Sequence, residues 1–196
     1  MGDGRAARVR AAILAGGSGS RLGGGKATVE LAGRPLIAYP LEAAVEAGLD
    51  PFVVAKRGSA LPELDCEVSR EPDEPTHPLL GILTALEVSD APLLALGCDM
   101  PFVTAPLLNW LAERDPPAVA EVGSRIEPLL AIYAPADAER LRGALADEAP
   151  LGAAVEALGP ERLGETQLAR FGEPRRLVSS VNTESDLAEA ARLLTD

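Results

Sequence analysis

The chain is poor in the residue types that several classes of binding site require. Only six of its 196 residues are aromatic, which argues against stacking platforms for single-stranded nucleic acid. It has one histidine and two cysteines, Cys66 and Cys98, which stand far apart in the sequence. These counts argue against a disulfide-rich scaffold and against a cysteine–histidine zinc site.

Long apolar runs are also missing. The apolar run near the N-terminus covers only residues 11–15, which is too short for a signal peptide. No stretch approaches the roughly 20 apolar residues of a transmembrane helix. We therefore expect a cytoplasmic protein without a membrane partner.

Negative charge dominates the sequence, but it is unevenly placed. The net charge is −12, which argues against a nucleic-acid partner because nucleic-acid binders usually carry a basic face. Residues 1–34 nevertheless hold six cations and only two anions. An acidic chain with one cationic, glycine-rich segment is expected to bind a small anionic ligand.

Apolar runs that alternate with amphipathic segments predict an α/β fold. The expected strands cover residues 9–15, 52–55, 66–69, 92–96, 118–122, 129–133 and 177–181. The expected helices cover residues 35–47, 79–88, 105–114, 136–146, 152–158 and 183–194. This alternation predicts a mostly parallel central sheet with helices on both faces, plus an antiparallel element near residues 123–124. The length suits a single domain over residues 1–196.

Residues 14–26 form a glycine-rich segment directly after the first expected strand. The segment contains six glycines, together with Arg21 and Lys26. Glycines let the backbone approach a ligand closely, and successive N–H groups can then hold phosphate oxygens. Lys26 is one of only two lysines beside sixteen arginines, which indicates a role that arginine does not fill. The alternative is a flexible surface loop.

Two better-known glycine loops do not fit this segment. A Walker A loop requires glycine where Ser20 stands and serine or threonine where Ala27 stands. A dinucleotide fingerprint requires glycine where Leu22 stands, which disfavours a dinucleotide-dependent oxidoreductase. A second candidate site element is Asp99, which follows the strand expected at 92–96, because α/β sheets bind ligands at the carboxyl ends of their strands. The alternative for Asp99 is a cap of the following turn.

Several short motifs, taken in order, resemble the molybdenum cofactor guanylyltransferase (MobA) family within the MobA-like NTP transferase superfamily. They are Leu-Ala-Gly-Gly at 14–17 with Arg-Leu-Gly at 21–23 and Lys26, Gly-Arg-Pro-Leu-Ile at 33–37, Pro-Leu-Leu-Gly-Ile at 78–82, Cys-Asp-Met-Pro-Phe at 98–102, Pro-Leu-Leu-Ala-Ile-Tyr at 128–133, and Val-Asn-Thr-Glu-Ser-Asp-Leu at 181–187. The resemblance spans about residues 12–190. It implies a three-layer αβα, Rossmann-like nucleotidyltransferase fold.

The resemblance also implies a reaction and a set of site residues. The family transfers GMP from GTP to the phosphate of molybdopterin with Mg²⁺ and releases pyrophosphate; molybdoenzymes or their chaperones receive the product. The implied catalytic residues are Arg21, Lys26 and Asp99, and the implied metal ligands are Asp99 and Asn182. The implied nucleotide-binding residues are Leu14, Ala15, Gly16, Gly17, Lys26, Lys56, Arg70 and Asp99. The family's acidic base-contacting position falls near Arg70 or Glu71, and Arg70 is the one included.

The chain departs from the family pattern at several of these positions. Gly25 stands where the family has aspartate, His77 where it has glycine, Glu127 where it has glutamine or histidine, and Ala131 where it has glycine. These departures leave the base and the acceptor open. The alternatives are a cytidylyltransferase, another NTP transferase with a different phosphorylated acceptor, and a catalytically degenerate nucleotide-binding relative. Asn182 is alternatively a loop residue before the Thr183 cap.

Overall fold

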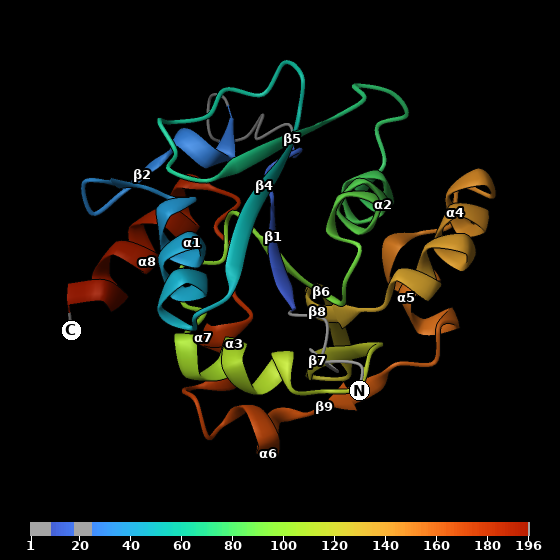
Figure 1. Ribbon diagram of the computed structural model, residues 1–196. Helices are drawn as coiled ribbons and strands as arrows, with labels where there is room; N and C mark the ends of the chain where they lie inside the picture. The colour runs from blue at the N-terminus through green and yellow to red at the C-terminus, as the bar shows by residue number, and fades with distance from the viewer. Residues whose placement is uncertain (1–8, 18–24, 196) are drawn as a thin grey trace, which may run out of the picture.

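The computed structural model describes residues 9–17 and 25–195 of the chain (Figure 1). In this part of the chain, seven strands form one sheet in the order β5-β4-β1-β6-β8-β7-β9. Of these strands only β8 runs antiparallel to its neighbours. The bounds are β1 Arg10–Leu14, β4 Asp50–Lys56, β5 Glu67–Glu71, β6 Leu93–Gly97, β7 Ala118–Val122, β8 Arg125–Tyr133 and β9 Glu161–Leu163. The expected α/β fold with a mostly parallel sheet is confirmed.

Helices cover both faces of the sheet, as Figure 1 shows. Their bounds are α1 Ala38–Glu46, α2 Pro78–Ser89, α3 Ala105–Ala112, α4 Ala138–Ala146, α5 Leu151–Ala157, α6 Glu165–Leu168, α7 Pro174–Leu177 and α8 Glu184–Thr195, with single 3-10 turns η2 at Lys26–Thr28 and η3 at Pro135–Asp137. Helices α1 and α3 pack on one face, and α2 and α5 pack on the other. Strand β1 serves both layers because its side chains alternate: Ile13 belongs to the first core and Ala12 to the second.

A third, smaller apolar cluster attaches the C-terminal helix. The hairpin of β2 Glu30–Leu31 and β3 Arg34–Pro35 packs Leu31 and Leu36 against Phe102, Val181 and Ala190. This cluster brings the segment before α8 next to the loop after β6. Two loops that are far apart in the sequence thus meet at one edge of the sheet. Among the described residues, no helix is both long and apolar enough to cross a lipid bilayer.

The strand predicted at residues 177–181 is wrong. The chain forms helix α7 at Pro174–Leu177 and then continues without regular structure. The Glu173 side chain accepts the N–H groups of Arg175 and Arg176, and Pro174 occupies the first helical position. These are the usual signals for the start of a helix, and the apolar run behind them belongs to a connecting loop instead.

A helix boundary and an edge strand also differ from the sequence prediction. The helix expected from residue 35 begins at Ala38, so Pro40 falls in its first turn, where a missing N–H costs no helical hydrogen bond. The edge strand β9, which pairs with β7 in parallel, was not predicted. It has only three residues, two of them charged and exposed, so it carries no apolar pattern.

Candidate nucleotide-binding and catalytic site

The strand order places a pocket at one edge of the sheet. Strand β1 has β4 on one side and β6 on the other, so the chain winds in opposite directions from this point. In such sheets the ligand crevice opens at the carboxyl ends of the strands on both sides of the reversal. A pocket of about 450 Å³ lies there, lined by Leu14, Gly16, Gly17, Lys26, Val54, Lys56, Glu71, Thr76, His77, Pro78, Gly81, Cys98, Asp99 and Leu129.

A buried carboxylate lies against the first glycine of the loop. Glu71, the last residue of β5, is only 4 % exposed. A Cβ atom at Gly16 would lie 2.0 Å from Glu71 Oε1, and one at Gly81 would lie 3.4 Å from Glu71 Oε2. Glycine at these two places therefore leaves room for the carboxylate between the loop and helix α2.

The Glu71 carboxylate lacks the donors that its burial requires. Among the described residues, Oε2 of Glu71 is buried without a hydrogen-bond partner. Burial raises the pKa of Glu71, while the nearby Lys56 acts in the opposite direction. A buried acceptor with no partner is costly unless a ligand supplies a donor. The pocket therefore suits a ligand with N–H groups that face Glu71.

Some backbone N–H groups at the start of the glycine loop are hydrogen-bonded within the sheet, and others have no acceptor among the described residues. The N–H of Ala15 donates to Val54 O over 2.8 Å, so it continues the sheet and is not left for a nucleotide. Ala15, one of the predicted nucleotide-binding residues, therefore does not offer its N–H to a ligand. Within the described residues, no acceptor is bonded to the N–H groups of Gly16 and Gly17, and both residues line the pocket with Leu14.

Three predicted residues meet at the other side of the pocket. Lys26 Nζ donates to Asp99 Oδ2 over 2.7 Å and also to Asn182 Oδ1. The Lys26 and Asp99 side chains are 20 % and 12 % exposed, so the ion pair is largely shielded from water. The backbone holds Asp99 in place, because Val181 N donates to Asp99 O over 2.9 Å. Glycine at position 97 leaves room for the Asp99 side chain, since a Cβ there would lie 2.7 Å from Asp99 Oδ1.

The donor set at this point fits a magnesium ion that arrives with a substrate. No group of three or more histidine, cysteine, aspartate or glutamate side chains with metal-binding geometry occurs in residues 9–17 and 25–195. The oxygens of Asp99 and Asn182 instead converge on one cation, the Lys26 ammonium. Mg²⁺ commonly takes one or two protein oxygens and completes its shell with water and substrate phosphates. Asp99 and Asn182 could supply those oxygens.

Of the predicted nucleotide-binding residues Lys56 and Arg70, only Lys56 lines the pocket. Lys56 lines the pocket, and its Nζ donates to Asp73 O over 2.8 Å and to Thr76 Oγ1 over 3.3 Å. Arg70 does not line the pocket: its guanidinium donates to Lys56 O and Ser59 O. The prediction of Arg70 as a pocket residue is therefore corrected.

Strand alternation explains why Glu71 and not Arg70 faces the pocket. Successive side chains of a strand point to opposite faces, so only one member of this pair can enter the pocket. The sequence prediction ended this strand at residue 69, before the two positions in question. The expected catalytic residue Arg21 lies outside the described residues.

His77 is a helix cap at the pocket wall. Its Nδ1 accepts the N–H of Leu79 over 3.2 Å at the first turn of α2. This contact satisfies one of the amides that every helix start leaves without an intrahelical partner. His77 therefore has a structural role at the start of helix α2.

The fold is that of solved nucleotidyltransferases. The crystal structure of molybdopterin-guanine dinucleotide biosynthesis protein A from Archaeoglobus fulgidus is similar over 95 % of this chain and 98 % of that chain, with a TM-score of 0.79. At 24 % identity this similarity shows the fold. A nucleotidyl transferase from Methanothermobacter thermautotroptrophicus gives a TM-score of 0.71 with 22 % identity over 96 % of this chain and 99 % of that chain.

Sequence comparison identifies the family. The MobA-like NTP transferase domain matches residues 11–163. A molybdenum cofactor guanylyltransferase of Cereibacter sphaeroides is 35 % identical and covers 93 % of this chain and 95 % of its own length. One from Acidiphilium cryptum is 32 % identical over 98 % of this chain and its whole length. The chain belongs to the MobA-like NTP transferase family, and it is a nucleotidyltransferase.

Proposed function

We propose that this chain transfers GMP from GTP to the phosphate of molybdopterin and releases pyrophosphate. Two relatives that align over nearly their whole length carry the name molybdenum cofactor guanylyltransferase. The observation that carries the choice of guanine is the buried Glu71 carboxylate at the wall of the pocket.

Guanine is the base whose hydrogen-bonding edge matches a carboxylate. Its N1–H and its 2-amino group are two adjacent donors, whereas adenine and cytosine place a ring acceptor beside their single amino group. A carboxylate only accepts, so it repels that ring acceptor. Each hydrogen bond to a charged group contributes about 1.5–3 kcal/mol, which is enough to favour GTP roughly tenfold or more. Donors from the base also favour the ionised form of Glu71 and offset the burial that raises its pKa.

The reaction needs no nucleophile from the protein. A phosphate monoester has a second pKa near 6, so the acceptor phosphate is already an anion at neutral pH and can attack the α-phosphorus of GTP. Cys98 is buried, and burial raises the pKa of its thiol to about 12, so it stays protonated. Catalysis then depends on positioning and on stabilising charge as pyrophosphate leaves.

The groups around Lys26 suit that task. Its ammonium lies between Asp99 and Asn182 in a pocket that Gly16 and Gly17 also line, where it can hold phosphate oxygens and balance the charge of the leaving group. Arg21, from the same loop, is proposed to assist. Asp99 and Asn182 would hold Mg²⁺, which neutralises phosphate charge when bound.

Calorimetric titration tests the proposal. GTP, CTP, ATP and UTP are each titrated with Mg²⁺ into the wild type, Glu71→Gln and Asp99→Ala. We expect tightest binding of GTP by the wild type, loss of that preference in Glu71→Gln, and weaker Mg²⁺-dependent binding of every triphosphate in Asp99→Ala. Pyrophosphate release with GTP and molybdopterin then tests the transfer. Preference of the wild type for CTP would contradict the guanine assignment, and no metal-dependent binding would contradict an active enzyme.

A further inference from the structure

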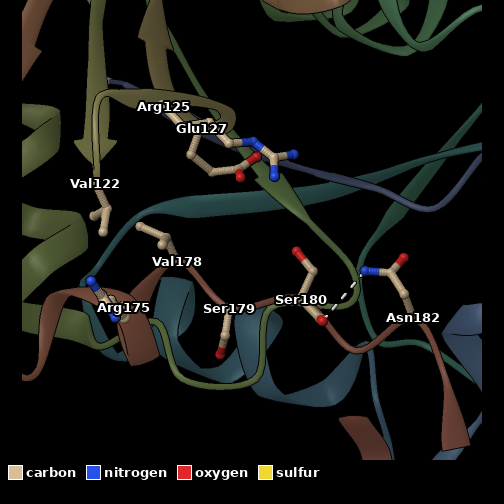
Figure 2. Close-up of a pocket in the computed structure, with 8 residues that line it drawn as sticks. All are labelled: Val122, Arg125, Glu127, Arg175, Val178, Ser179, Ser180 and Asn182. Carbon is tan, nitrogen blue, oxygen red and sulfur yellow. Dashed lines mark hydrogen bonds between the residues drawn. The ribbon is translucent and has the colours of Figure 1, made fainter. Parts of the chain in front are cut away.

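A second pocket, of about 330 Å³, adjoins the Lys26–Asp99 pair. Figure 2 shows its lining side chains: Arg125 and Glu127 project from β8 on one side, and Ser179, Ser180 and Asn182 lie on the segment between α7 and α8 on the other. Asn182 accepts a hydrogen bond from Lys26, so this pocket begins where the nucleotide pocket ends. The steps proposed above leave Arg125, Glu127 and Arg175 without a role.

An irregularity in strand β8 directs Glu127 toward this pocket. Val119 of β7 pairs with Ala131, yet the next residue, Ala120, pairs with Glu127, so residues 128–130 have no partner on β7. Pro128 stands in this stretch and has no N–H to give to a sheet. The buried Tyr133 hydroxyl donates to Pro128 O over 2.8 Å and holds the distorted segment in place. Bulges of this kind re-aim side chains beside active sites.

The Glu127 carboxylate is short of donors. Its Oε1 accepts one long hydrogen bond, 3.4 Å, from the N–H of Leu129. Burial raises the pKa of Glu127; the Leu129 amide and Arg125 lower it, and the nearby Asp99 raises it further. Glu127 is half-buried, whereas Glu71 in the nucleotide pocket is buried, and among the described residues neither carboxylate accepts a hydrogen bond from a side chain.

Two guanidinium groups complete the second pocket. Arg125 and Arg175 both line it, and within residues 9–17 and 25–195 neither has a carboxylate at ion-pair distance. A ligand that fits must therefore offer N–H donors to Glu127 and anionic groups to the arginines. A volume of this size suits a small bicyclic molecule.

We propose that this pocket binds the heterocycle of the acceptor and that Glu127 accepts hydrogen bonds from the ring N–H and the 2-amino group of a pterin. The inference rests on the proposed function, because the acceptor named there is a pterin. The 2-amino-4-oxo edge of a pterin carries the same adjacent pair of donors as guanine. Glu71 and Glu127 thus flank the Lys26–Asp99 pair as two matching carboxylates, one for each heterocycle of a dinucleotide product.

The test measures binding of free pterin by its fluorescence. The control ligand is lumazine, which has the same two rings but an oxygen in place of the 2-amino group. The variant is Glu127→Gln, which keeps the shape and removes the charge and one acceptor. The matched control is Glu161→Gln, which changes an exposed glutamate on the edge strand β9. Circular dichroism melting checks that each variant is folded.

We expect the wild type to bind pterin at least about tenfold more tightly than lumazine, as one charge-assisted hydrogen bond predicts. Glu127→Gln should lose that preference while it binds GTP as the wild type does, and Glu161→Gln should change neither. Unchanged pterin binding in Glu127→Gln, or equal binding of the two rings by the wild type, would overturn the inference. Retained pterin selectivity in a protein that does not prefer GTP would leave this pocket assigned and would contradict the proposed donor nucleotide instead.

Discussion

Substitution of Gly16 by alanine is expected to change nucleotide selectivity without unfolding the protein. The new Cβ would lie 2.0 Å from Glu71 Oε1, a separation that no pair of unbonded atoms tolerates. The nearest obstacle is the end of a glutamate side chain and not backbone, so the carboxylate moves while the loop and strand β1 stay in place. Gly17→Ala is the matched control, because a Cβ at that neighbouring position meets nothing within 4 Å.

The size of the effect follows from the hydrogen bonds that a displaced Glu71 can no longer make. Loss of one bond between a charged acceptor and the base costs about 1.5–3 kcal/mol. At about 1.4 kcal/mol per factor of ten, GTP affinity should fall roughly 10- to 150-fold. Alanine in place of glycine also restricts the unfolded chain, which stabilises the folded state by about 0.4–1 kcal/mol. We therefore expect no loss of thermal stability and only a small change in the melting temperature.

Titration calorimetry with GTP and CTP on Gly16→Ala, Gly17→Ala and the wild type provides the assay. Gly16→Ala should lose its preference for GTP, Gly17→Ala should keep it, and CTP binding should differ little among the three proteins. Wild-type selectivity in Gly16→Ala would refute the reasoning, because the carboxylate would then have no part in base choice. An equal loss in both variants would refute it too, since any added methyl in the loop would then suffice.

Three other perturbations follow from the same contacts. Lys26→Ala should abolish transfer and lower the free energy of unfolding in urea by about 1–3 kcal/mol, because it leaves the largely buried Asp99 carboxylate without its cation. The double variant Lys26→Ala/Asp99→Ala should recover most of the stability and none of the activity. Purely additive losses of unfolding free energy in the double variant would contradict the pairing. Tyr133→Phe should lower unfolding free energy by about 1–3 kcal/mol, since Pro128 O loses its buried donor, and a thermal scan that matches the wild type would argue against that bond. Burial raises the pKa of Glu71 above its ordinary 4.5, so the native state holds that proton more tightly than the unfolded state does. Stability therefore falls as pH rises from about 4.5 through the raised native pKa. Glu71→Gln should melt at a higher temperature than the wild type at neutral pH, and this difference should vanish below pH 4.5.

Local patterns in the sequence were sufficient for the fold class and for the part of the site that lies next to regular elements. Alternating apolar strands and amphipathic helices imply a parallel sheet, since each layer has to bury one face. Asp99 was predicted because it directly follows a buried strand, and Lys26 because it closes a glycine loop. Both predictions used only neighbours in the chain, and the structure places the two side chains 2.7 Å apart at Nζ and Oδ2.

Register and long-range packing decided the rest. The choice between Arg70 and Glu71 depends on which face of β5 the last residue occupies, and a shift of one residue exchanges the two faces. The direction of the Glu127 side chain depends on the irregular pairing of β8 with β7, which no local sequence pattern predicts. The approach of Asn182 to Lys26 needs the apolar cluster that packs α8 on the β2–β3 hairpin. Sequence determines the chemistry of each short segment, whereas the meeting of segments about 70 to 160 residues apart is set by packing energies summed over the whole fold.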